Sequence, residues 1–224
     1  MIRFITGTDT GVGKTVAAAV LAHRARADGK LVRYLKPAQT GVRPGGKGDA
    51  AFVAAVSGVE ASEILRFDEA LAPAVAAERS GQTIDFDGLT ADVLSHETGY
   101  DELLVEGAGG LLAPLAGNRT MADLATALRA DAVVVTRPGL GTLNHTALTL
   151  EAAERRGLPV EGLVVCGWPS RPGLAERTNL ERLAAMAPLV AVIRRLRGVS
   201  VDEHRHSVLT LALERGTALA HPER

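Results

Sequence analysis

Short apolar runs alternate along the chain with longer segments of helical periodicity. The apolar runs are rich in valine, isoleucine and leucine, as strands are when helices cover both faces of their sheet. Such an alternation is typical of βαβ units on a mostly parallel sheet. The pattern predicts strands at 3–6, 31–36, 103–106, 132–136, 162–166 and 189–193, and helices at 14–27, 50–56, 86–96, 121–128, 143–156 and 174–186.

Composition narrows the class of protein. The 224 residues are 46% hydrophobic and 23% charged, as in ordinary globular chains, and we expect one domain over 1–224. A formal charge of -1 gives no electrostatic attraction for nucleic acid or an anionic membrane, so neither is expected as a partner. The single cysteine, Cys166, excludes an internal disulfide framework and a cysteine-built zinc or iron–sulfur site. A reducing, cytoplasmic setting fits this composition.

Three further features bear on setting and ligands. No apolar run approaches the ~18 residues of a membrane span, and the first strand begins too early to leave room for a signal peptide. The glycine-rich loop at 41–48 is either a lid or a plain surface connection. His204 and His206 have no third ligand nearby in the sequence, so we expect no metal there.

A glycine-rich turn at 7–15, Gly-Thr-Asp-Thr-Gly-Val-Gly-Lys-Thr, lies between the first predicted strand and the first predicted helix. Such a turn points backbone N–H groups and a helix N-terminus at one place, which favours phosphate binding. Lys14 would reach the β- and γ-phosphates, and the Thr15 hydroxyl would bind Mg²⁺. The spacing departs from the usual phosphate loop, because Gly7 lies one residue further from Gly13 and Thr8 stands where glycine is expected.

A second apolar strand ends in a carboxylate, Glu106, and continues into the glycine-rich turn 107–110. An acidic side chain at a strand end beside a phosphate loop can hold the metal that bridges phosphates. Glu106 is therefore a candidate Mg²⁺ ligand; a solvated glutamate before a turn is the alternative.

Two more segments carry weaker indications. Lys36 ends an apolar strand and would place a cation near the phosphate loop if the second strand neighbours the first, although a simple strand-end charge fits equally. Asp49, by itself, indicates no more than a helix N-cap. The turn at 137–142 opens another helix, with Thr142 as the expected cap and free N–H groups over 143–145 that could bind a carboxylate.

Together these segments resemble the dethiobiotin synthetase family. The resemblance is carried by 6–15, 36–41, 105–110 and 141–145, which occur in the family's order, and it spans residues 2–168. The long phosphate loop is the family's own form. The resemblance implies a single three-layer α/β/α domain of the P-loop NTPase type. It also implies a homodimeric enzyme that uses ATP and Mg²⁺ to convert 7,8-diaminopelargonate and CO₂ to dethiobiotin, ADP and phosphate.

The resemblance also assigns roles to residues. Lys14 and Lys36 would be catalytic, stabilising a substrate carbamate and the transferring phosphoryl group, while Thr15, Asp49 and Glu106 would hold Mg²⁺. Substrate contacts would come from Thr10, Thr40, Gly110, Leu143 and Asn144. Leu143 and Asn144 lie with His145 at a helix start, which the partner subunit would contribute to bind the tail carboxylate of the substrate. Nucleotide contacts would come from Gly11, Val12, Gly13, Lys14, Thr15, Val16, Asp49, Glu106, Gly107, Ala108, Gly109, Cys166 and Gly167.

The resemblance thins after Val165. Many family members carry an Asn-Asp pair there that reads the purine, whereas this chain has Cys166 and Gly167. Without the amide, contact with the base is lost or made by backbone, and we predict poor discrimination among nucleoside triphosphates. Trp168 could stack on the base or simply pack in the core.

Other classes stay open at this point. A nucleotide-switch ATPase of the septum-placement or plasmid-partition type shares the loop, but such proteins typically have a lysine where this chain has Asp9. An amidating synthetase usually adds a glutamine amidotransferase domain with a nucleophilic cysteine. A nucleotide-binding regulator without catalysis is a third alternative, although every candidate catalytic position is filled here.

Overall fold

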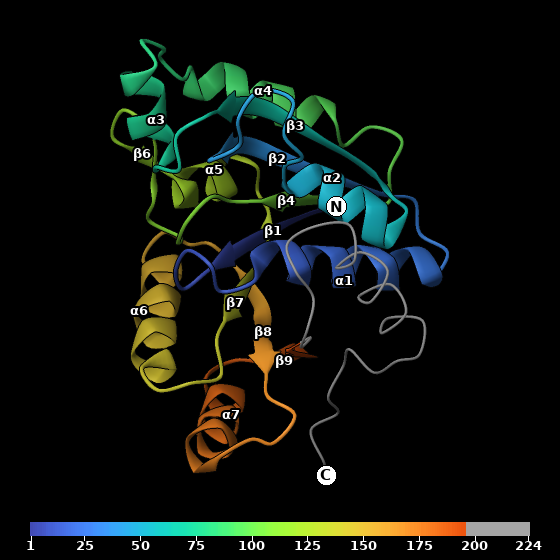
Figure 1. The fold of residues 1–224 in the computed structure, drawn as a ribbon, viewed down its shortest axis with the longest axis vertical. Helices are drawn as coiled ribbons and strands as arrows, with labels where there is room; N and C mark the ends of the chain where they lie inside the picture. The colour runs from blue at the N-terminus through green and yellow to red at the C-terminus, as the bar shows by residue number, and fades with distance from the viewer. Residues whose placement is uncertain (196–224) are drawn as a thin grey trace.

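In the computed structural model, which describes residues 1–195, seven strands form one sheet in the order β3-β2-β4-β1-β7-β8-β9 (Figure 1). Every neighbouring pair in this sheet is parallel. A separate antiparallel ribbon pairs β5 with β6. The strands are β1 (Ile2–Gly7), β2 (Val32–Thr40), β3 (Glu60–Phe67), β4 (Glu102–Glu106), β5 (Pro114–Ala116), β6 (Arg119–Thr120), β7 (Asp131–Thr136), β8 (Val160–Trp168) and β9 (Leu189–Arg194).

Helices cover both faces of the sheet, which confirms the predicted three-layer α/β/α fold. Along β1, Phe4 packs in a buried cluster with α4 and α5, while Ile5 packs with α1 and α2 on the opposite face. Successive strand residues point to opposite faces, so a strand covered on both sides must be apolar throughout. The helices in residues 1–195 are α1 (Lys14–Ala27), α2 (Asp49–Ser57), α3 (Pro73–Arg79), α4 (Phe86–Ser95), α5 (Met121–Ala127), α6 (Thr142–Glu154) and α7 (Leu174–Met186).

Four elements were missing from the sequence prediction: β3, α3 and the two short strands of the ribbon, β5 and β6. β3 is one of the two edge strands of the sheet, and in it only Phe67 is buried, so no apolar run marks it. The six strands and six helices that the pattern predicted are present, with ends that differ by a few residues.

The placement of β2 corrects two expectations about Lys36. This lysine lies inside β2, which continues to Thr40, and it therefore does not end the strand. β2 also does not neighbour β1, because β4 lies between them. The carboxyl end of β4 thus separates Lys36 from the phosphate loop, and Glu106 lies between the two.

In the part of the chain that the structure describes, no helix is both long and apolar enough to cross a membrane. His204 and His206, and the last part of the domain expected over 1–224, lie outside the described residues.

Candidate active site

A cavity of about 270 Å³ opens where β1, β2 and β4 end, the edge at which parallel α/β sheets bind ligands. It brings together residues from four segments that are far apart in the sequence. Its lining consists of Thr10, Gly11, Lys14, Thr15, Lys36, Gln39, Thr40, Asp49, Glu106, Ala108 and Gly109.

The phosphate loop joins β1 to α1 at one wall of the cavity. Gly13 is the N-cap of α1 in a left-handed conformation, with φ of 100°, and a β-carbon there would collide with Cys166 Sγ. Only glycine suits both conditions. No side chain caps the helix, so its first N–H groups are available to a phosphate. The Lys14 ammonium donates to the Asp9 carbonyl oxygen at 3.0 Å.

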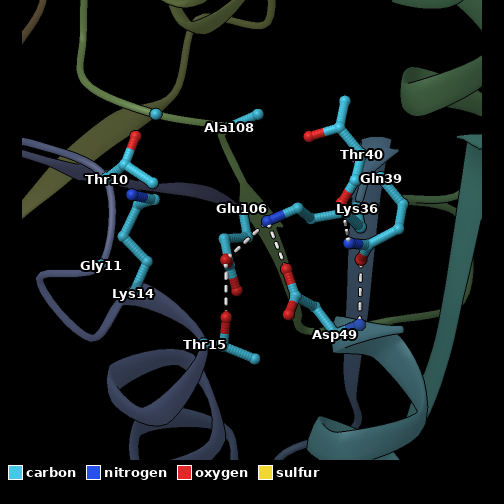
Figure 2. A pocket seen from close by; sticks show the side chains of 11 residues that line it. Thr10, Gly11, Lys14, Thr15, Lys36, Gln39, Thr40, Asp49, Glu106 and Ala108 are labelled. Carbon is cyan, nitrogen blue, oxygen red and sulfur yellow. Dashed lines mark hydrogen bonds and ion pairs between the residues drawn. The ribbon is translucent and has the colours of Figure 1, made fainter. Parts of the chain in front are cut away.

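Lys36 lies between two carboxylates at the base of the cavity (Figure 2). Its Nζ is 2.7 Å from Glu106 Oε1 and 2.7 Å from Asp49 Oδ2. The Thr15 hydroxyl donates to the same Glu106 Oε1 at 3.0 Å. A hydroxyl, two carboxylates and a lysine therefore converge on one point beside the phosphate loop.

The charges in this cluster shift the pKa of both lysines. Burial alone would lower the pKa of Lys36, but the carboxylates of Glu106 and Asp49 outweigh it and raise the pKa, so the side chain stays charged. Burial lowers the pKa of Lys14 to about 8; Glu106 opposes the shift and Lys36 adds to it. A bound phosphate would supply the anion that Lys14 lacks here.

The donor set of this cluster fits a hard divalent cation. Thr15, Asp49 and Glu106 offer oxygen ligands, which Mg²⁺ prefers, and Mg²⁺ usually takes one or two carboxylates and leaves its other positions to water and phosphate. Within residues 1–195 no group of three or more His, Cys, Asp or Glu side chains could hold a metal. Protein side chains alone therefore do not complete a cage, and nucleotide phosphates would have to.

The structure also decides the position of Asp49. The N-cap of α2 is Gly48, and Asp49 is the first residue of the helix, so the N-cap expectation was wrong. Its side chain instead faces Lys36. A single sequence could not reveal this contact, because it joins β2 to α2 across the loop 41–48.

Two buried polar residues that sequence analysis did not single out support the cluster. Gln39 Oε1 accepts the backbone N–H of Asp49 at 2.9 Å and so fixes the start of α2. The Tyr34 hydroxyl donates to Glu106 Oε2 at 2.8 Å. Burial and the nearby Glu106 carboxylate raise the pKa of Tyr34 well above its usual value. Tyr34 and Lys36 are two residues apart in β2 and therefore lie on the same face of the strand. This spacing was an available indication that they share a site.

The other expected nucleotide and substrate residues lie around the cavity in different ways. Gly110 packs against the Gly7 carbonyl oxygen, which a β-carbon would approach to 3.4 Å, and this holds the turn after β4 beside the phosphate loop. The Gly107 carbonyl oxygen accepts a hydrogen bond from Lys36 at 3.5 Å. Val12 is buried, and Val16 packs against the cluster that contains it; neither residue lines the cavity.

The end of β8 lies behind the phosphate loop. Cys166 is partly buried against Gly13, and burial raises the pKa of its thiol to about 11. Gly167 has a positive φ of 88° and, like Cys166, does not line the cavity. Trp168 is buried in a cluster with Leu183, so it has the packing role that was one of its two alternatives.

The start of α6 differs from the expectation. Gly141 is the N-cap, and Thr142 is the first helical residue, whose hydroxyl lies 2.6 Å from that of Thr136. The His145 N–H donates to the Gly141 carbonyl oxygen at 3.2 Å and is therefore not free for a carboxylate. Leu143 and Asn144 do not line the cavity of their own chain.

The parallel sheet, the phosphate loop and the acidic residue that ends β4 define the class: this is a P-loop NTPase fold. Solved structures share it, among them the septum site-determining protein MinD of Pyrococcus horikoshii, with a TM-score of 0.54 at 18% identity over 88% of this chain and 82% of that one. A putative plasmid partition protein of Borrelia burgdorferi gives a TM-score of 0.60 at 11% identity over 99% and 92%. At these identities the likeness concerns the fold alone.

Sequence comparison is more specific. A family model described as an AAA domain matches residues 3–201. The ATP-dependent dethiobiotin synthetase BioD of Rhodococcus jostii is 52% identical over 188 residues, which cover 83% of this chain and 81% of that protein. The protein of the same name from Frankia casuarinae is 49% identical over 84% and 82%. The chain belongs to the dethiobiotin synthetase family, as its motifs predicted.

Proposed function

We propose that this chain is an ATP-dependent dethiobiotin synthetase, a cyclo-ligase of biotin biosynthesis that forms the ureido ring from 7,8-diaminopelargonate and CO₂. Family membership supports the activity. Among the observations in the structure, the one that carries it is the convergence of Lys14, Lys36 and the Glu106 carboxylate on a single cavity beside the phosphate loop.

The reaction moves a negative phosphoryl group onto a negative carbamate. One amine of the substrate adds to CO₂ and loses a proton to give a carbamate, and a carbamate oxygen attacks the γ-phosphorus of ATP. ADP leaves, and a carbamic–phosphoric anhydride forms. The second amine then attacks the carbonyl carbon, releases phosphate and closes the ring. Such steps depend on positioning and on fixed positive charge.

The two lysines would supply that positive charge. Lys14, at the start of α1, would bind the phosphates, and their negative charge would keep its ammonium group protonated. Lys36, held by Glu106 and Asp49, is fixed before any substrate arrives and would stabilise the carbamate and the transferring phosphoryl group. Pre-positioned charge of this kind needs no reorganisation during the reaction.

The metal would be held by Thr15, Asp49 and Glu106, whose oxygens fit it. Bound Mg²⁺ would neutralise charge on the β- and γ-phosphates. Within the chain, the Thr15 hydroxyl and the Glu106 carboxylate already contact each other, so little rearrangement would be needed to direct both oxygens at one cation.

The remaining roles concern the diamine. Thr10 and Thr40 line the cavity and would contact the amines or the carbamate, with Gly110 behind them. Leu143 and Asn144 lie outside the cavity of their own chain, which is consistent with a site that a partner subunit completes in a homodimer. A cytoplasmic location is consistent with the single cysteine.

The test is phosphate release from MgATP and bicarbonate, with and without 7,8-diaminopelargonate, followed by mass spectrometry of the products. We expect phosphate only with the diamine, together with a product that has gained one carbonyl. Phosphate release that ignores the diamine, with no new product, would contradict the synthetase and favour a nucleotide-switch ATPase.

A further inference from the structure

Glu106 is a buried carboxylate whose two oxygens have different partners. It is 1% exposed, and its Oε1 accepts from Thr15 and Lys36 on the side of the cavity. Its Oε2 accepts from the Tyr34 hydroxyl, which lies 2.8 Å away. Tyr34 itself is fully buried among side chains of α1 and α2 and does not line the cavity.

This arrangement fixes the rotation of the Glu106 side chain. A buried carboxylate oxygen without a donor is costly, so Oε2 stays where a donor exists. With Oε2 held by Tyr34, Oε1 is the oxygen presented to Thr15 and Lys36. β2 and β4 pair in register at Tyr34 with Leu104 and at Leu35 with Val105, the residue before Glu106, so the donor and the acceptor stand on a rigid frame.

We propose that Tyr34 is a positioning residue of this enzyme: its hydroxyl, by holding Glu106 Oε2, aims Oε1 at the place where the divalent cation of the nucleotide binds. The inference rests on the proposed function, because it assigns Tyr34 a task at that same site. Residues behind a metal ligand that orient it typically change metal affinity or activity by about 10- to 100-fold when they are removed.

The experiment compares wild type with Tyr34→Phe in the full chain. Phenylalanine keeps the ring in the core and removes the hydroxyl alone. Mn²⁺ binding in the presence of saturating ADP is measured by electron paramagnetic resonance, and ADP binding is measured separately with the metal chelated. We expect the Mn²⁺ dissociation constant to rise about tenfold or more. ADP binding without metal should change by less than about twofold, because Tyr34 does not face the phosphate loop.

The chain offers a matched control, because it has two tyrosines. The Tyr100 hydroxyl donates to Glu60 at the surface, so Tyr100→Phe removes the same group away from the cavity. It should leave Mn²⁺ binding unchanged. In steady state, the Mg²⁺ concentration that gives half the maximal rate should rise for Tyr34→Phe by the same factor as the dissociation constant, and the KM of the diamine should stay constant.

The outcomes separate the inference from the function on which it rests. If wild type and Tyr34→Phe bind Mn²⁺ equally, or if the variant only melts at a lower temperature, Tyr34 has a merely structural role and the inference fails while the proposed function stands. If wild type with ADP binds no Mn²⁺, the proposed metal ligands fail first.

A measurement on wild type does not depend on whether the variant folds. With tyrosine labelled by ¹³C at Cζ, adding Mg²⁺ to the ADP complex should shift the Tyr34 resonance and leave that of Tyr100 in place. An unchanged Tyr34 resonance would overturn the inference.

Discussion

Lys36 shows how much a single side chain depends on its neighbours. An isolated buried ammonium would lose its proton, yet Glu106 and Asp49, each 2.7 Å away, keep it charged. The same two contacts leave the side chain with little freedom, which is the condition for fixed charge in catalysis.

Removing this charge should be costly for the rate. We expect Lys36→Ala to lower kcat by about 10²- to 10³-fold, because the transferring phosphoryl group loses a fixed cation. Lys30→Ala is the control. Lys30 pairs with Glu102 where β2 and β4 begin, at the end of these strands away from the cavity, and its side chain is 43% exposed. Phosphate release in the presence of the diamine measures both variants. A Lys36→Ala enzyme with at least a tenth of the wild-type rate would contradict this role.

Cys166 should react slowly although it is the chain's single cysteine. Because its pKa is raised to about 11, the thiol is almost entirely protonated at pH 8, and only the thiolate reacts. We expect iodoacetamide to modify the folded protein at pH 8 at about a tenth of the rate of the urea-unfolded protein, or at a lower rate. In the unfolded protein the thiol has the pKa of a free thiol, about 8.5. Between pH 8 and 10 the rate should climb steadily. Mass spectrometry of the adduct measures the rate at each pH. A rate that reaches a plateau near pH 9 would be inconsistent with the raised pKa.

At the scale of elements, the sequence was most informative where the physics is local. The helix 14–27 and the helix 174–186 were predicted with the bounds that the structure shows, because a glycine-rich start and an apolar periodicity define them within one stretch of chain. β3 was not predicted, because this edge strand is mostly unburied and so has no apolar run. The ion pair of Lys36 with Asp49 was not predicted, because it depends on how α2 packs against β2. The hydrogen bond from the Asp49 N–H to Gln39 Oε1 fixes that packing.

The end of β8 sets the expected selectivity for the nucleotide base. Cys166 and Gly167 offer a thiol packed against Gly13 and a glycine backbone, and no side-chain amide. A site rejects a wrong base strongly only when it has polar groups that the wrong base leaves unpaired. We therefore expect kcat/KM for ATP to exceed that for CTP by less than about a hundredfold, measured at fixed diamine and bicarbonate. A larger preference would mean that another element reads the base.

At the scale of the whole molecule, the cavity of the described chain is lined by the lysines and carboxylates of the cluster but not by the start of α6. The cavity joins β1, β2 and β4, whereas Leu143 and Asn144 at the start of α6, expected to bind the tail carboxylate of the diamine, do not line it. A symmetric dimer in which each α6 completes the partner's cavity would make both observations consistent.

Such sharing predicts complementation between two inactive enzymes. Asn144→Asp adds a negative charge in the first turn of α6, which suits the helix dipole but repels a substrate carboxylate. Mixed and reassembled with Lys36→Ala, it should form heterodimers with one site that carries both defects and one that carries neither. About half of the dimers would be mixed, so about a quarter of the wild-type activity should return if sites are shared in this way. Each variant assayed alone is the control. If the mixture shows no more activity than the two variants assayed separately, the substrate tail is bound within one subunit, and the proposed role of Leu143 and Asn144 across the dimer is wrong.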